Sequence, residues 1–211
     1  MISWDNSAQG SPEWLALRKQ MATASNANTL AGKSDTRAKY LRRVAWHIVN
    51  GPDDGEEPGY KSAAMERGNV LEPHACDAAA EQFGLLLSEV GVCFNDEWPF
   101  CGASLDRLDI GGKVAVEVKC PMLDTMLDYE EKPEKLLSKY RRQCAIQMII
   151  AELDTVYLYA WHPRQRPIWH RLERDSWSDE ISEMEEHLSR AIVDIQRYKR
   201  HYEETSTWLT T

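Results

Sequence analysis

Residues 114–119 alternate between two kinds of side chain, which constrains this part of the chain to a β-strand. Valines at every second position alternate with Ala115, Glu117 and Lys119. Successive side chains of a strand point to opposite faces, so Glu117 and Lys119 project from the same face. Apolar segments precede and follow the stretch, which predicts a central strand. Charged side chains on a central strand need partners, and the fold must supply them.

A second carboxylate is predicted to lie beside this strand. Ten residues separate Asp106 from Glu117, and the turn sequence Asp-Ile-Gly-Gly at 109–112 lies between them. A hairpin at this turn would bring the two carboxylates together. They would repel each other unless a cation lay between them, and oxygen ligands suit Mg²⁺ or Mn²⁺. The spacing by itself also fits an ion pair between Glu117 and Lys119 on an exposed strand.

Hydrophobic periodicity predicts an α/β or α+β domain with a central mixed sheet. Segments rich in Val, Leu, Phe, Tyr and Trp predict strands at 85–94, 98–105, 113–120, 155–162 and 167–173. Capping residues and 3.6-residue periodicity predict helices that begin near Ser11, Ser25 and Ser34 or Asp35, and further helices at 62–83, 133–151 and 177–205. We expect Pro73 to interrupt or kink the helix at 62–83.

Length and composition indicate a single domain over residues 1–211, with 43% hydrophobic and 28% charged residues. We find no apolar run of about 18 residues and no signal-peptide pattern at the N-terminus, so we expect a cytoplasmic protein. The five cysteines are odd in number and show no C-x-x-C spacing, which argues against a disulfide framework or a zinc site.

The formal net charge of −9 argues at first against a nucleic-acid partner. Charge is unevenly distributed, however, because residues 1–50 carry seven Lys and Arg against three Asp and Glu. Acidic proteins can still bind a polyanion when their positive groups line one groove. The cluster Arg37, Lys39, Arg42 and Arg43 fits either a face that follows phosphates or an ordinary solvated helix face.

Four segments accompany the Asp106, Glu117 and Lys119 pattern in a fixed order. They are Gly10-Ser11-Pro12-Glu13-Trp14 with Arg18 and Thr23-Ala24-Ser25, then Gly68-x3-Glu72-Pro73-x-Ala75, then Glu117-Val118-Lys119-Cys120-Pro121, and last Tyr140-x2-Gln143 with Gln147-Met148. Together with a last strand that ends at Pro163, these motifs resemble the lambda exonuclease (YqaJ-type) family of the PD-(D/E)xK nuclease superfamily. The resemblance spans residues 10–163.

This resemblance implies a restriction-endonuclease-like core, with a central mixed sheet flanked by helices. It implies a Mg²⁺-dependent exodeoxyribonuclease that degrades one strand of double-stranded DNA from a 5′ end, releases mononucleotides and leaves 3′ single-stranded tails for recombination by strand annealing. It further implies a homotrimeric ring threaded by DNA, a single-strand annealing protein as partner, and a phage or prophage origin in a bacterial host.

The resemblance also assigns roles around the metal. Asp106, Glu117 and the carbonyl of Val118 are expected to bind metal, and Glu72 to complete the second of two Mg²⁺ positions or to hold a bound water. Mn²⁺ could replace Mg²⁺. Lys119 is expected to polarise or deprotonate the attacking water and to offset charge on the pentavalent phosphorus.

Substrate-binding roles follow from the same resemblance. Arg18 and Ser25 match the positions that hold a terminal 5′ phosphate, a task that suits a guanidinium group. Gln143 and Tyr140 are expected to contact substrate. The family helix often carries Gln-x-Gln where this chain has Ala145 at the second position, so we assign no role to Gln147.

The chain departs from the family at one other motif, because Ser104-Leu105-Asp106-Arg107 stands where Ser-Pro-Asp-Gly is usual. The carboxylate is retained, so we expect little loss of function from this departure.

Two alternative functions remain open from the sequence. One is an endonuclease or nickase of the same superfamily, which would use the same residues. The other is a non-catalytic module that binds DNA ends, although intact carboxylates on a central strand argue against it.

Overall fold

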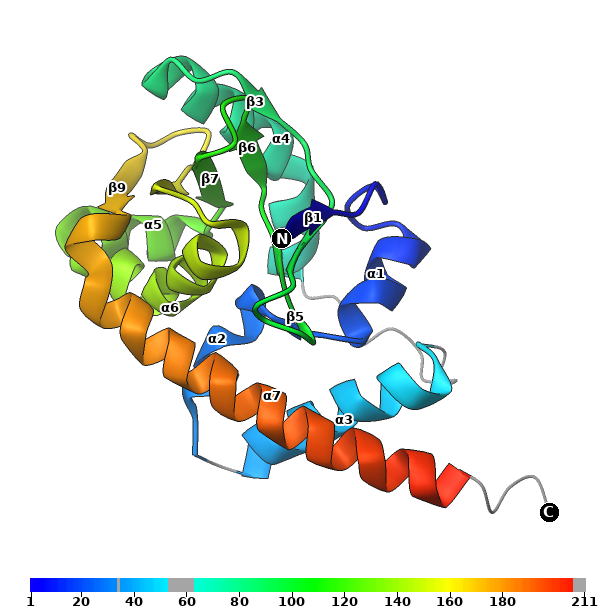
Figure 1. Cartoon of the computed structure of the whole chain (residues 1–211). Coiled ribbons are helices and arrows are strands. Elements are labelled where there is room, and N and C mark those ends of the chain that lie inside the picture. Colours follow the sequence, from blue (N-terminus) through cyan, green and yellow to red (C-terminus); the bar gives the residue numbers. More distant parts are fainter. Residues whose placement is uncertain (34, 53–62, 207–211) are drawn as a thin grey trace.

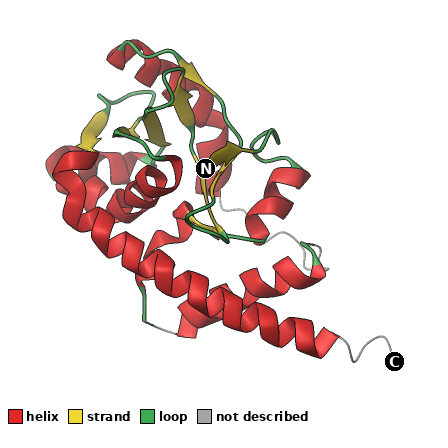
Figure 2. Ribbon diagram, viewed as in Figure 1, coloured by secondary structure: helices red, strands yellow, loops and turns green. Residues whose placement is uncertain are grey.

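The computed structural model describes residues 1–33, 35–52 and 63–206, and it arranges them as helices around two β-sheets (Figure 1, Figure 2). The helices are α1 (Pro12–Lys19), α2 (Ala27–Ala31), α3 (Asp35–Asn50), α4 (Ala63–Phe83), α5 (Leu123–Glu131), α6 (Glu134–Ala151) and α7 (Ser178–Ser206), with 3-10 turns at Ala24–Asn26 and Arg174–Trp177. Mixed α/β structure is therefore confirmed. Residues 34 and 62, where two predicted helices could begin, lie outside the described ranges.

The strands are β1 (Ile2–Trp4), β2 (Ala22–Thr23), β3 (Leu87–Ser88), β4 (Val92–Asn95), β5 (Cys101–Ser104), β6 (Arg107–Asp109), β7 (Val114–Lys119), β8 (Thr155–Ala160) and β9 (Ile168–Glu173). Within the described ranges they form one sheet in the order β1-β4-β5-β2 and another in the order β3-β6-β7-β8-β9. Both sheets are mixed, because β2 is parallel to β5 and β7 is parallel to β8, while the other pairs are antiparallel. The sequence had led us to expect one central sheet.

The chain passes from one sheet to the other on both sides of β4 and β5. The predicted strand at 85–94 is divided into β3 and β4, because the chain turns away at Gly91 to run beside the N-terminal segment. A Cβ atom at Gly91 would lie only 2.1 Å from the carbonyl oxygen of Asp5, so this close approach requires glycine. The predicted strand at 98–105 begins only at Cys101, because Phe100 adopts a left-handed conformation with φ of 65°.

Strand β7 is central in its sheet, as the apolar segments on both sides of it predicted, and each of its faces is covered by a helix. Val116 and Val118 are buried against α4, where they pack with Ala75, Cys76 and Ala79. Ala115 and the opposite face belong to the main core with α6. Glu117 is therefore directed into the interior of the protein, beneath α6.

Helix α6 is also the element that joins the two sheets. It contacts β8 of one sheet and β4 and β5 of the other, and its second half is almost entirely buried. The long α7 runs diagonally across the molecule and packs on α3 and α6 (Figure 1). Its buried residues share one stripe, as the periodicity predicted: Ile181, Met184, Leu188, Ala191 and Ile195.

Several short elements were not predicted from the sequence. Strands β1 and β2 have three and two residues, too few for a periodic pattern to be visible. Helix α5 lies between the central strand and α6 and was also missed. Helix α4 continues through Pro73 without the interruption that we considered. Among the described residues, no helix is long and apolar enough to span a membrane.

Candidate active site

The hairpin of β6 and β7 places Asp106 beside Glu117, as the turn sequence predicted. Arg107 pairs with Val116 across the antiparallel ladder, so Asp106, one position earlier, lies opposite Glu117. Gly112 adopts φ of 73° in the turn. The backbone N–H of Val118 donates to Oδ2 of Asp106 over 2.7 Å, which orients the carboxylate along β7. Asp106 thus lies just before β6, in the connection from β5, and Glu117 lies on the neighbouring strand β7.

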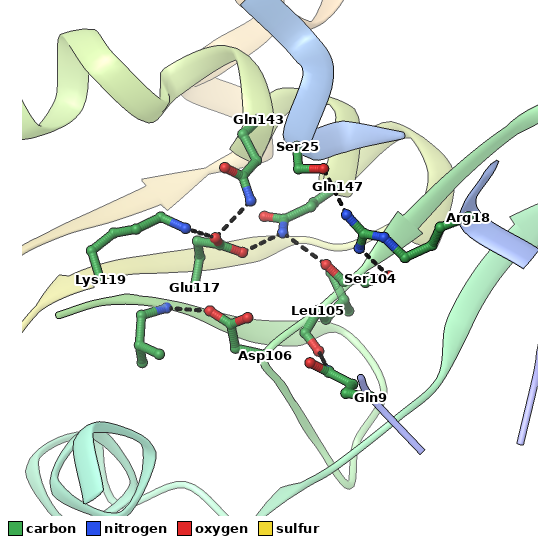
Figure 3. A network of polar contacts seen from close by, with 11 residues as sticks. Gln9, Arg18, Ser25, Ser104, Leu105, Asp106, Glu117, Lys119, Gln143 and Gln147 are labelled. Carbon is green, nitrogen blue, oxygen red and sulfur yellow. Dashed lines mark hydrogen bonds and ion pairs between the residues drawn. The ribbon is translucent and has the colours of Figure 1, made fainter. Parts of the chain in front are cut away.

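The carboxylate of Glu117 is buried and accepts from several donors (Figure 3). Its side chain is only 2% exposed, and Lys119 forms an ion pair with Oε1. Helix α6 contributes the amide of Gln143, which donates to Oε1 over 2.6 Å, and the amide of Gln147, which donates to Oε2. Burying a carboxylate is costly unless it is paired and hydrogen-bonded, and these partners meet that need.

Lys119 lies between Glu117 and the ring of Tyr140. Its Nζ is 4.8 Å from the ring centroid, a cation–π geometry. Burial lowers the pKa of Lys119, but attraction to the charges of Glu117 and Asp106 outweighs burial, so the pKa is raised above its usual value. The side chain is therefore a cation in this arrangement.

The acidic side chains at the site carry unbalanced negative charge. Burial, followed by the charge of Glu117, raises the pKa of Asp106 well above its usual value. Burial also raises the pKa of Glu72; the charge of Arg107 acts against this increase, and the charge of Glu117 adds a smaller one. A cation placed among these carboxylates would relieve both effects.

The residues present fit a hard divalent cation, although they do not form a complete ligand set in this arrangement. Glu72 from α4, Val118 and Lys119 line a common cavity of about 510 Å³ that reaches α5 and α6. Oxygen donors of this kind suit Mg²⁺ or Mn²⁺. Among the described residues, no three His, Cys, Asp or Glu side chains are close enough to bind a metal together. Glu117 faces its amide and lysine partners instead.

A second polar cluster, built around Arg18, lies near the carboxylates. The guanidinium of Arg18 donates to Oγ of Ser104 over 2.9 Å and to Oγ of Ser25 over 2.8 Å, and it stacks on Trp14 at 4.2 Å. Burial lowers the pKa of Arg18, while Tyr40, Glu117 and other neighbouring groups act in the opposite direction. A half-buried guanidinium held by two hydroxyl groups is suited to bind an anion.

The structure brings together most residues that the sequence singled out. Gln143 and Tyr140 project from α6 toward Glu117 and Lys119, and Arg18 contacts Ser25 directly. In the basic cluster, Arg37 does not belong to an exposed face, because its Nη1 donates to Asp194 over 2.7 Å and its side chain is 16% exposed.

Two residues of the site were missed. Ser104 precedes Asp106 by two positions and holds Arg18, and Gln147 follows Gln143 by one helical turn and reaches Glu117. For Gln147, the spacing of four residues on a helix was the available signal, since it places both amides on one face.

Comparisons with known proteins agree on one family of relatives. The family model of the YqaJ-like viral recombinase domain matches residues 13–154. The crystal structure of LHK-Exo in complex with dAMP is 26% identical, with a TM-score of 0.77, over 94% of this chain and 100% of that chain. A structure of this alkaline exonuclease from Laribacter hongkongensis is 25% identical with a TM-score of 0.75, over 94% of this chain and 100% of that chain.

A phage related exonuclease from Haemophilus somnus 129PT has a similar fold. It is 16% identical, with a TM-score of 0.66, over 88% of this chain and 96% of that chain. At this identity the likeness concerns the fold alone. No curated protein matches the chain.

The charge balance of the site predicts that divalent cations stabilise the fold. At a free Mg²⁺ or Mn²⁺ concentration about 100 times Kd, the gain is about 2.7 kcal/mol, which raises Tm by roughly 5–10 °C for a chain of this size. Thermal unfolding with each metal and with EDTA measures the shift. Asp106→Asn should lose most of it, whereas Glu81→Gln, which changes an exposed carboxylate of α4, should retain it. An equal shift in both variants would contradict binding at Asp106.

Proposed function

The chain belongs to the family of YqaJ-like viral recombinase domains, as its motifs predicted, and from that membership we propose that it is a metal-dependent 5′-to-3′ exodeoxyribonuclease on double-stranded DNA. The alkaline exonuclease relatives support a nuclease role. One of them was crystallised with dAMP, a deoxynucleoside monophosphate, which is the kind of product that an enzyme releasing mononucleotides would form.

One observation carries the choice of an exonuclease: the candidate catalytic cluster and a cationic group suited to bind phosphate lie side by side. The first is the cluster of Asp106, Glu117 and Lys119, and the second is Arg18 between two serine hydroxyls. Ser104 joins them, because it holds Arg18 and its carbonyl accepts from Gln147, which also donates to Glu117. One cluster would act on the scissile phosphate while the other holds the terminal 5′ phosphate.

In this proposal the acidic residues hold two Mg²⁺ ions, or Mn²⁺ in their place. Asp106, Glu117 and the Val118 carbonyl bind metal, and Glu72 completes the second position or holds a bound water. When bound there, the metal would supply Lewis-acid chemistry, which lowers the pKa of water and stabilises the leaving 3′ oxygen. Lys119, as a cation, polarises the attacking water and offsets the charge that develops on phosphorus.

Substrate contacts complete the proposed site. Arg18 and Ser25 hold the 5′ phosphate, and their existing mutual hydrogen bond keeps the guanidinium in place before DNA binds. Gln143 and Tyr140 of α6 contact the substrate in this proposal, which is supported by the contact of Gln143 with Glu117 and of Tyr140 with Lys119. The product is a mononucleotide, and the complementary strand is left as a 3′ tail for recombination.

A homotrimeric ring around DNA is part of the proposal, with a single-strand annealing protein as functional partner in the cytoplasm of a phage-infected or lysogenic bacterium. A closed ring suits processive degradation, because it cannot dissociate between cuts. The ring would also place basic groups toward DNA despite the net charge of −9. Light scattering should give three times the chain mass of 24.2 kDa, and a monomeric mass would contradict the ring.

The reaction can be tested on linear duplex DNA with one strand labelled at its 5′ end and the other at its 3′ end. With Mg²⁺ we expect immediate release of the 5′ label as mononucleotide and gradual shortening of the 3′-labelled strand, with no reaction in EDTA. A covalently closed plasmid should remain intact. A nicked or linearised plasmid would indicate an endonuclease, and end binding without cleavage would indicate a binding module.

Lys119 is predicted to serve cleavage more than binding. Lys119→Ala should lower the cleavage rate by about 100- to 1,000-fold, because it removes a positive charge at the reacting phosphate. Affinity for DNA ends, measured by fluorescence anisotropy in Ca²⁺, should change little. The matched control is Lys113→Ala, which removes an exposed lysine at the other end of the same strand. A Lys119→Ala variant with a near wild-type rate would refute the mechanism.

Arg18 is predicted to confer a preference for 5′-phosphorylated ends. Arg18→Ala should reduce the rate ratio between 5′-phosphate and 5′-hydroxyl duplexes by about 10- to 100-fold, because a hydrogen bond to a charged group contributes roughly 1.5–3 kcal/mol. Arg200→Ala, on the exposed face of α7, is the control and should keep the ratio. If the Arg18 variant kept the wild-type ratio, Arg18 would not belong to the phosphate site.

A further inference from the structure

Gln147 occupies a position that links the two parts of the site. The residue is 1% exposed, and its side chain extends from α6 into the interior of the protein. Nε2 donates to Oε2 of Glu117 on β7 and, over 3.3 Å, to the carbonyl oxygen of Ser104 on β5. The two strands belong to different sheets, so this single amide group connects the sheets exactly where the acidic cluster meets the Arg18 cluster (Figure 3).

The same amide leaves one of its own atoms without a partner. Oε1 of Gln147 is buried and has no hydrogen-bond donor among the residues that the structure describes. An unpaired buried acceptor costs free energy, and such groups are rare in folded proteins. The amide is kept in spite of this cost, and the contacts that it makes through Nε2 are those to Glu117 and to Ser104.

The consequence of this bridge is geometric. Ser104 is bound from both sides, because its hydroxyl accepts from Arg18 and its carbonyl accepts from Gln147. Arg18 is therefore connected to Glu117 by three hydrogen bonds in series. The first joins Arg18 to the Ser104 hydroxyl, the second joins the Ser104 carbonyl to Gln147, and the third joins Gln147 to Glu117. A shift of Glu117 relative to the Arg18 cluster would break one of these bonds.

We infer that Gln147 is a positioning residue that sets the distance between the Arg18 cluster and the carboxylate of Glu117, and so determines which phosphodiester bond is cut when a 5′ phosphate is held. This inference rests on the proposed function, because it assumes that Arg18 binds the terminal phosphate. With the distance set, the first phosphodiester bond lies at the acidic cluster. Without Gln147 to set this distance, binding of the 5′ phosphate no longer aligns the first phosphodiester bond.

Gln143 provides a matched comparison within the same helix. It donates to the other oxygen of Glu117 over 2.6 Å, but among the described residues no hydrogen bond joins it to Ser104. Loss of Gln143 removes support from Glu117 and the proposed contact with substrate, but it leaves the connection to the Arg18 cluster intact. Loss of Gln147 removes the same kind of support and, in addition, the connection to the Arg18 cluster.

The experiment compares Gln147→Met with Gln143→Met, since methionine keeps side-chain length and helix propensity but donates no hydrogen bond. Full-length variants digest matched duplexes with 5′-phosphate or 5′-hydroxyl ends in Mg²⁺, and both rates and product lengths are measured. Misalignment by about 1 Å can lower a rate about 100-fold. We expect Gln147→Met to reduce the phosphate-to-hydroxyl rate ratio by about tenfold or more and to release dinucleotides with the mononucleotides.

Gln143→Met should slow both substrates by a similar factor, so its rate ratio and its mononucleotide product should match the wild type. A wild-type ratio in Gln147→Met would overturn the inference, even if both rates fell. Thermal unfolding shows whether each variant is folded; if Gln147→Met is not, Gln147→Asn, which withdraws the amide by one methylene, takes its place in the same assay.

The outcomes also separate this inference from the proposed function. If the wild-type protein prefers 5′-phosphate ends, Arg18→Ala abolishes the preference and Gln147→Met retains it, then only the role of Gln147 is wrong. If the wild-type protein cuts DNA without any phosphate preference, the terminal phosphate site and the positioning role are both overturned. If it does not cut DNA at all, the proposed function itself fails.

Discussion

The buried carboxylate of Glu117 is the group on which the rest of the site depends. A negative charge at 2% exposure needs partners, and the structure supplies them from its own strand and from α6. Removing one partner of a buried charge costs about 3–5 kcal/mol. Hydrogen bonds as well as packing therefore fix the position of α6 relative to β7. Because Glu117 has such strong contacts with its neighbours, α6 cannot shift without disturbing the acidic cluster.

The division of the strands into two sheets explains how the site is assembled. Asp106 lies where the chain leaves β5 for β6, that is, where it crosses from one sheet to the other. The carboxylates therefore gather at the boundary between the sheets, and the Arg18 cluster reaches the same boundary from the N-terminal side. Helix α6 contacts both sheets and contributes the side chains that join the two clusters.

The charges are organised locally although the chain as a whole is acidic. Lys119 and Arg18 both lie next to carboxylates, and both retain positive charge near groups whose own pKa values are raised by burial and mutual repulsion. Such an arrangement has two consequences for a polyanion: cations on the protein attract phosphate, and divalent metal relieves the repulsion among carboxylates. A net charge of −9 is thus compatible with DNA as substrate.

The sequence by itself determined the strand that carries Glu117 and Lys119, the hairpin that brings Asp106 beside it, the stripe of α7 and the family, because alternation, turn residues and ordered motifs are local properties. Only the tertiary structure decided that the strands form two sheets, that Gln147 reaches Glu117, and that Arg18 bonds to Ser104 across 86 positions of the chain. The physical reason is that periodicity records which side of an element is buried but not which element covers it; that choice depends on packing between segments far apart in the sequence.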